Sequence, residues 1–364
     1  MIEKIPFSQD EMVPMLVMPG RRGAPDRTIF QVPITLRENM LSTLGEHTGM
    51  YISNVFDMKP YHTRLIPDNI ARNAVMDGGD PRPPREEGEL DAFGVKWIFE
   101  PQVGGSMVPP GNPILDDIED WEEVIKFPNP DEWDWEGAAK LAEPYLANCT
   151  QAVQSTIFTG YFERLISWMD FEDAAVTMID EDAEDALEAL FTKTTDLYIS
   201  YVDHLAKYIH PDVIQLHDDW GSQMAPFMSY DTYQEKIVPH MKRFNDRCHE
   251  YGIYTDLHSC GKVDSLVPLM IEAGFDSWQG QRHNDKLACV QKYGDKICIQ
   301  VEVPEFGLEA TDEEIREGME KWCADYIIDG KLPMISLYSK EVPNRPYVTD
   351  VLYELSRKIL CGEA

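Results

Sequence analysis

His258 and Cys260 are separated by one residue in the segment TDLHSCGKVDSL (255–266). An imidazole nitrogen and a thiolate sulfur are two of the ligands that zinc prefers in proteins. Both residue types are also ordinary in a protein core, so the pair indicates a metal site only if the fold brings both side chains to a functional surface. His258 and Cys260 are therefore candidate metal ligands whose role depends on the elements that position them.

From about residue 150 onward, short apolar segments that are typical of strands alternate with segments that have the periodicity of amphipathic helices. In the last third of the chain the strands recur at intervals of roughly twenty residues, which favours parallel strands joined by crossover helices. No glycine-rich dinucleotide fingerprint follows any of them. The pattern predicts an α/β fold, a (β/α)8 TIM barrel rather than an open doubly wound sheet. The predicted strands cover 151–158, 212–217, 253–258, 275–278, 297–303 and 333–338.

Three of the intervening helices carry recognisable start and stop signals. The helix expected over 230–252 contains Pro239, which should kink it, and ends at Gly252. Asp264 is expected to cap the next helix, which Gly274 should end. Thr311 and Glu314 form a capping-box pattern at the start of another.

We expect one barrel domain over residues 1–364. Within it, 1–150 should form an irregular, partly helical N-terminal collar with the first barrel elements, and 151–364 the main βα repeats. The collar contains a helix candidate over 38–56 and a Pro/Gly/acid-rich passage over 81–94. Long irregular stretches of this kind either pack on a barrel as structural support or shape the mouth of its pocket, and both roles stay open.

In a barrel the chemistry belongs at the C-terminal ends of the strands. His258 and Cys260 lie at such an end, and Gly261 supplies the tight turn after them. The adjacent Asp218 and Asp219 should point in different ways, one capping the next helix and one facing the pocket. Further polar residues fall at successive strand ends, and this coincidence indicates a site. They are Asp218, Asp219 and Gln223 after the strand over 212–217, Gln279 and Gln281 after 275–278, Glu302 at the end of 297–303, and Tyr338 at the end of 333–338.

Charge and composition exclude several classes of protein. The chain has 32 basic and 65 acidic residues and a net charge of −33, which repels phosphate backbones and excludes nucleic acid as a partner. The mean hydropathy of −0.36, without an apolar run near eighteen residues, excludes a membrane span. The first twenty residues lack a signal-peptide pattern, so a cytoplasmic location is expected. Seven cysteines, an odd number, fit reduced thiols better than a disulfide framework.

The pairing of DDWGSQ (218–223) with LHSCG (257–261) resembles the uroporphyrinogen decarboxylase superfamily, and specifically its corrinoid-dependent methyltransferase branch. The segments over 91–136 and 161–182 are similar to the same branch. The resemblance implies a distorted TIM barrel, often dimeric, in which the His and Cys of an HxC motif bind zinc together with a further ligand. Here these residues are His258 and Cys260. It also implies transfer of a methyl group to or from the cobalt of a corrinoid protein.

Two motifs of the superfamily are missing from this sequence, and their absence narrows the set of reactions that the resemblance implies. The decarboxylases use an arginine-containing RQAGR-type motif that the region 30–47 lacks, which disfavours decarboxylation. The thiol methyltransferases carry a third zinc-ligating cysteine at the last barrel strand, where the segment over 333–346 has none. Cys298 and Cys323 are expected in the core. Glu302 is the favoured third ligand by its place at a strand end, with Asp218, Asp219 and His283 as rivals.

A zinc ion with fewer thiolate ligands is a stronger Lewis acid, which suits polarisation of an ether oxygen. The chain also resembles the methyltransferases of anaerobic O-demethylase systems more than the thiol methyltransferases, which implies a zinc-dependent O-demethylase methyltransferase of anaerobic one-carbon metabolism. It would move a methyl group from an aromatic methyl ether to the cobalt(I) of a corrinoid. A separate partner protein should carry the corrinoid (cobalamin), because no DxHxxG-type segment is present. The alternatives are a methylcobalamin:thiol methyltransferase and a non-catalytic binding relative.

Within this function the rim residues have expected roles. Asp218, Asp219 and Tyr338 are catalytic, with Tyr338 as the proton donor to the leaving oxygen. Substrate binding is assigned to Gln223, Gln279 and Gln281, and zinc binding to His258, Cys260 and Glu302.

Overall fold

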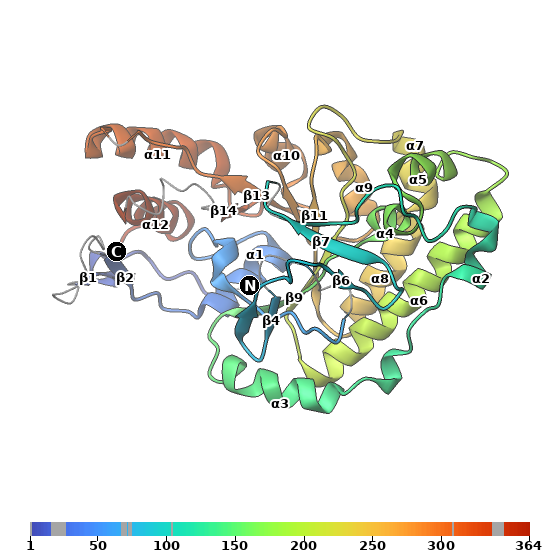
Figure 1. Cartoon of the computed structure of the whole chain (residues 1–364). Coiled ribbons are helices and arrows are strands. Elements are labelled where there is room, and N and C mark those ends of the chain that lie inside the picture. Colours follow the sequence, from blue (N-terminus) through green and yellow to red (C-terminus); the bar gives the residue numbers. More distant parts are fainter. Residues whose placement is uncertain are drawn as a thin grey trace. The chain divides into compact units, whose positions relative to one another are not determined.

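The computed structural model describes residues 2–15, 27–66, 71, 75–102, 105–307, 309–336 and 346–364. Figure 1 shows its helices and strands, coloured along the chain. The chain divides into two compact units that interleave in the sequence. The first comprises Met1–Met58, Thr150–Ala152 and Asp285–Ala364, and the second Lys59–Cys149 and Val153–Asn284. The expected single domain, with a collar that ends at residue 150, stays a prediction.

The second unit contains the parallel strands that carry the candidate site. Four of these strands pair side by side in the order in which they follow one another along the chain. Their side chains are mostly buried on both faces, as in parallel sheets that helices cover. All four correspond to predicted strands. They are β9 (Ala152–Ile157), β10 (Val213–His217), β11 (Tyr254–Ser259) and β12 (Ser277–Gly280), and β3 (Met58–Pro60) follows β9 in the sheet order.

Helices alternate with these strands, and α6 packs along α8. The predicted kink at Pro239 is instead a break. One helix ends at Lys236 and another begins at Val238, so the proline lies in a first turn where no N–H is needed. Asp264 does not cap its helix but is the first residue of a 3₁₀ turn. The helices are α4 (Tyr161–Met169), α5 (Phe171–Thr177), α6 (Glu184–Tyr208), α7 (Tyr230–Lys236), α8 (Val238–Glu250), η5 (Asp264–Leu266) and α9 (Val267–Glu272).

The part of the collar in the second unit contains short antiparallel strands that the sequence did not predict. A buried ion pair holds it to α4, because Arg164 Nη1 lies 2.7 Å from Asp91 Oδ2 with both side chains fully buried. The Arg164 guanidinium also lies 4.7 Å from the centre of the Phe93 ring. The elements are β4 (Val75–Asp77), β5 (Asp80–Arg82), β6 (Glu89–Leu90), β7 (Lys96–Glu100), β8 (Gly105–Met107), η3 (Ile118–Asp120), α2 (Trp121–Val124), η4 (Pro130–Glu132) and α3 (Trp135–Leu146).

The first unit holds the last two predicted strands, which pair in parallel. Its first helix stops at Glu46, short of the predicted 38–56, because His47 adopts a left-handed conformation with φ of 52°. The predicted capping box of Thr311 and Glu314 is present. The elements are η1 (Gln9–Glu11), β1 (Met12–Met15), β2 (Arg27–Phe30), α1 (Leu36–Glu46), η2 (Val55–Asp57), α10 (Lys286–Tyr293), β13 (Cys298–Glu302), α11 (Asp312–Tyr326), β14 (Met334–Ser336) and α12 (Pro346–Cys361).

Cys298 and Cys323 are fully buried, as expected of core cysteines. Burial raises the pKa of the Cys323 thiol to about 12. No helix in the described ranges is both long and apolar enough to cross a membrane.

Candidate metal centre

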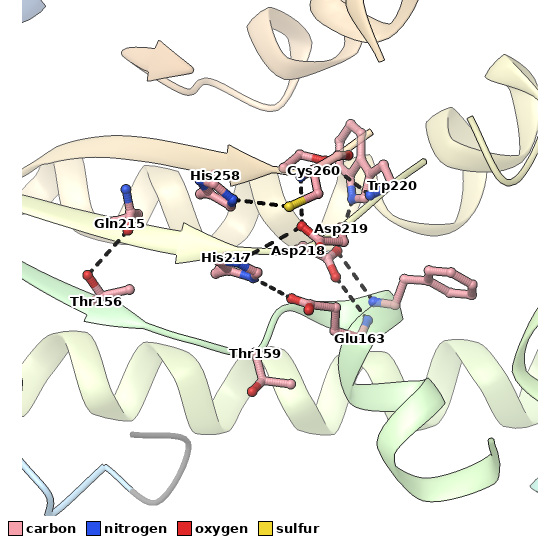
Figure 2. Close-up of polar contacts among 12 residues, drawn as sticks. Thr156, Thr159, Glu163, Gln215, His217, Asp218, Asp219, Trp220, His258 and Cys260 are labelled. Atoms are coloured by element: carbon pink, nitrogen blue, oxygen red, sulfur yellow. Dashed lines mark hydrogen bonds and ion pairs between the residues drawn. The ribbon is translucent and has the colours of Figure 1, made fainter. Parts of the chain in front are cut away.

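The ends of β10 and β11 bring two histidines together. The parallel register places His217 directly opposite His258. Because side chains one residue apart on a strand point to opposite faces, two residues that share a register position project on the same face. Their imidazole rings stack with centroids 4.4 Å apart and planes 16° from parallel. Figure 2 shows the two rings side by side at the strand ends.

Cys260 follows β11 and turns its sulfur back toward His258. Its Sγ lies 3.5 Å from His258 Nε2, and its backbone N–H donates to Asp219 Oδ1 at 2.7 Å. The turn requires Gly261, which has φ of +96°, because a Cβ there would come within 2.2 Å of the Gly221 carbonyl oxygen. The expected tight turn is therefore present, and the loops after β10 and β11 are in direct contact.

The donor set fits a zinc ion. His217, Asp219 and His258 each offer one ligand atom, and these three atoms lie within 4.8 Å of one another. In a tetrahedral site with ordinary zinc–nitrogen and zinc–sulfur bonds, the two ligand atoms are about 3.5 Å apart. The separation of His258 Nε2 and Cys260 Sγ is 3.5 Å. Two imidazoles, a thiol and a carboxylate are donor types that zinc accepts.

The groups around Asp219 favour the ionised form of its carboxyl group. Burial alone would raise the pKa of this carboxyl, but the neighbouring His217 and His258 and the hydrogen bonds from Cys260 lower it overall. Asp219 thus places a negative charge beside both imidazoles, where a cation would be stabilised.

Glu163 on α4 contacts the outer side of His217. Its Oε2 lies 2.7 Å from His217 Nδ1, and the two side chains are 21% and 16% exposed. The other ring nitrogen, Nε2, lies 4.0 Å from Asp219 Oδ1. His217 thus has one nitrogen toward a carboxylate and the other toward the cluster.

Asp218 points away from its neighbour Asp219, as expected, but it holds α4, which precedes β10 in the chain, rather than the next helix. It is fully buried and accepts hydrogen bonds from Glu163 N at 3.0 Å, Phe162 N at 3.3 Å and Trp220 Nε1 at 3.0 Å. Burial, followed by the charge of Glu163, raises the pKa of Asp218 to about 7. Its predicted catalytic role stays a prediction.

The three predicted substrate-binding glutamines have different surroundings. Gln279 pairs with His258 in the strand register and donates to the buried Asp256 at 2.6 Å. Gln281 accepts from Gly261 N at 3.1 Å and so supports the turn after Cys260. Gln223 is exposed in the loop after β10. Contact of these side chains with a substrate stays a prediction.

Of the remaining predicted residues, Glu302 and His283 are in the described part of the chain. Glu302, in the first unit, has Lys286 Nζ 3.5 Å from its carboxylate, and its role as third ligand stays a prediction. His283 is half-buried, and its Nε2 has no hydrogen-bond partner in the structure. Tyr338 lies outside the described residues.

Sequence reasoning did not assign His217 and Glu163 to the site. His217 had a signal in the segments IQLH (214–217) and TDLH (255–258), which end two neighbouring strands in the same way. Glu163 had none, because it is 54 positions from His217 and meets it only through the packing of α4 on β10.

The model of the uroporphyrinogen decarboxylase (URO-D) family matches residues 88–331, more than half of the chain. The chain belongs to the uroporphyrinogen decarboxylase family. No curated protein matches it.

Solved structures give the fold of this family member. A methyltransferase from Methanosarcina mazei is 15% identical, with 88% of this chain and 98% of that chain covered and a TM-score of 0.57. This likeness confirms the predicted (β/α)8 barrel class. A D-psicose 3-epimerase from Clostridium cellulolyticum is 10% identical, with a TM-score of 0.31 over 63% of this chain and 84% of that one. A family 2 AP endonuclease from Brucella melitensis is 11% identical, with a TM-score of 0.33 over 60% and 85%.

Proposed function

We propose that this family member is a zinc-dependent methyltransferase. It moves a methyl group from a methyl ether, with a methoxylated aromatic compound as the expected donor, to the cobalt(I) of a corrinoid on a separate protein. The observation that carries the proposal is the group of two imidazoles and a carboxylate at the ends of β10 and β11, with the thiol of Cys260 against one of the imidazoles. Membership of the family and the likeness in fold to a protein described as a methyltransferase support it.

His258 and Cys260 are the proposed first two ligands, and His217 and Asp219 offer further donors in the same cluster. When bound, zinc supplies a Lewis acid that stabilises negative charge on the oxygen that loses the methyl group. The O–CH3 bond breaks and its electron pair stays on the oxygen. The electron pair of cobalt(I) forms the new bond to the methyl group, and the departing alkoxide or phenolate takes up a proton. Tyr338 remains the proposed proton donor and Glu302 a proposed alternative ligand.

The ligand chemistry favours a reaction in which an ether donates the methyl group over one in which a thiol accepts it. The group of His217, Asp219 and His258 offers nitrogen and oxygen donors, and the one thiol beside it, Cys260, contacts His258. A site with few thiolates retains more positive charge on zinc and is a better Lewis acid toward oxygen.

We also expect a corrinoid protein as partner, a homodimer, and a cytoplasmic location.

The test compares the two directions of transfer. The purified protein is incubated with a panel of methoxyarenes and cobalt(I) cobalamin, and separately with methylcobalamin and a thiol such as coenzyme M, while the corrinoid absorbance is followed. We expect methylation of cobalt(I) with at least one methoxyarene and no transfer to the thiol. Transfer to the thiol alone would reverse the assigned direction. Activity in neither assay, over a broad panel of methyl donors, would contradict the proposal.

A further inference from the structure

The contact between Glu163 and His217 has a geometry that zinc sites use. Histidines that bind zinc commonly donate the N–H of their other ring nitrogen to a carboxylate, which fixes the tautomer and the orientation of the ring. Glu163 Oε2 lies 2.7 Å from His217 Nδ1, at the distance of a strong hydrogen bond. With the proton on Nδ1, the lone pair of Nε2 is directed toward the side of Asp219 and His258 (Figure 2).

We propose that His217 is the third protein ligand of the zinc site and that Glu163 is the positioning residue that holds it there. This inference rests on the proposed zinc-dependent function. It assigns the third ligand to β10, next to the strand that bears His258, in place of Glu302. Glu163 acts through His217 and does not itself touch the metal.

The local structure holds Glu163 firmly in this role. The fully buried carboxylate of Asp218 accepts hydrogen bonds from the backbone N–H groups of Phe162 and Glu163, which lie in the first turn of α4 and have no partner within the helix. Asp218 and His217 are adjacent at the end of β10. Asp218, just after β10, therefore fixes the start of α4, and Glu163 in the first turn of α4 contacts His217 at the end of β10.

Gly160 allows this close approach. It immediately precedes α4, and a Cβ at this position would lie 2.3 Å from Asp218 Cβ and 2.6 Å from its carboxyl carbon. A side chain of any size would separate the helix start from the strand end. The arrangement of Gly160, Asp218 and Glu163 thus orients His217 in the absence of a metal.

A second His–Glu pair in the same unit shows the contrast. His240 Nε2 lies 3.1 Å from Glu188 Oε2, but Glu188 is 60% exposed. The other nitrogen of His240 contacts Thr195 Oγ1 at 3.2 Å. Both ring nitrogens of His240 are thus occupied by protein groups, and none is left to bind a metal. Glu188 is therefore a matched control for Glu163.

The experiment measures zinc affinity by competition with a chromophoric chelator, without any turnover. The variants are Glu163→Ala, Glu163→Gln, His217→Ala, the Glu163→Ala/His217→Ala double variant and the control Glu188→Ala. We expect Glu163→Ala to weaken zinc binding about 10- to 100-fold, Glu163→Gln to retain part of the affinity, and Glu188→Ala to bind as the unmodified protein does. Because Glu163 acts through His217, the double variant should bind no more weakly than His217→Ala alone.

The outcomes separate this inference from the function on which it rests. Equal zinc affinity in the unmodified protein, Glu163→Ala and His217→Ala would overturn the inference and leave the zinc site of His258 and Cys260 intact. No zinc binding by the unmodified protein would overturn both. The d–d absorption of the cobalt(II)-substituted proteins provides a second readout, which should lose its four-coordinate intensity in Glu163→Ala and keep it in Glu188→Ala. A general loss of folding is recognised in the far-UV circular dichroism, and Glu163→Gln then carries the test.

Discussion

His217 and His258 occupy the same register position on neighbouring parallel strands, and their rings stack with centroids 4.4 Å apart. Two imidazoles held this way, with Asp219 and Cys260 in the loops just beyond them, place four donor groups at one barrel end. The arrangement follows from the two-residue alternation of strand side chains and from a turn that only glycine can make at position 261.

Substitution of Gly160 should disturb both stability and zinc binding. In Gly160→Ala the new methyl group would overlap Asp218, and relief of that contact must move α4 and Glu163. We expect a loss of about 1–3 kcal/mol in the free energy of unfolding, measured with urea, together with weaker zinc binding. Gly105→Ala is the control, since nothing lies within 4 Å of its added Cβ. Equal effects of the two substitutions would contradict the account of the helix start.

The buried ion pair of Arg164 and Asp91 should be important for stability. Arg164→Leu leaves the Asp91 carboxylate buried without its charged partner, at an expected cost of about 3–5 kcal/mol in the free energy of unfolding. The double variant with Asp91→Asn should recover part of this loss. The control is Arg243→Leu, which removes a half-exposed pair with Asp196 and should cost at most about 1 kcal/mol. A loss of similar size in both single variants would mean that burial of the pair is unimportant.

Asp256 should give the stability a characteristic pH dependence. It is fully buried and accepts hydrogen bonds of 2.6 Å from Ser277, Gln215 and Gln279. Burial raises its pKa to about 6, well above the value of about 3.9 for an unfolded chain. The folded state therefore binds the proton of the Asp256 carboxyl more tightly than the unfolded state does. The contribution of this proton to the free energy of unfolding is full below about pH 4 and is lost as the pH rises through about 6.

Asp256→Asn removes this titration while keeping the size of the side chain. We expect the free energy of unfolding of the variant to fall less steeply between pH 4 and pH 6 than that of the unmodified protein. The difference in slope should amount to at most about 3 kcal/mol over the window. Asp57 and Asp218, whose pKa values burial also raises, are present in both proteins, so they do not contribute to the difference. Parallel pH profiles would be the contrary result.

The sequence predicted those parts of the fold that depend on local pattern. All six expected strands are present, and Cys260 and His258 lie at a strand end as expected, because short apolar segments and turn residues are local signals. The collar was predicted less well, since its strands are two to five residues long, too short for a periodic signal.

Contacts between distant residues could not be predicted in this way. The charge of Arg164 gave no indication that it pairs with Asp91, 73 positions away, inside the second unit. Asp264 was expected to cap a helix because its residue type favours caps, but in the structure it begins a 3₁₀ turn and pairs with Lys262. Local propensity was overruled there by the tertiary position of the loop.

The central claim is tested most directly by metal analysis of the purified protein and of Cys260→Ser, with Cys149→Ser as a control at a cysteine of similar exposure. We predict about one zinc per chain in the unmodified protein and in Cys149→Ser, and none in Cys260→Ser. The cobalt(II)-substituted forms should show a thiolate-to-cobalt charge-transfer band that only Cys260→Ser lacks. Zinc retained in Cys260→Ser, or full methyl transfer by a metal-free protein, would contradict the account.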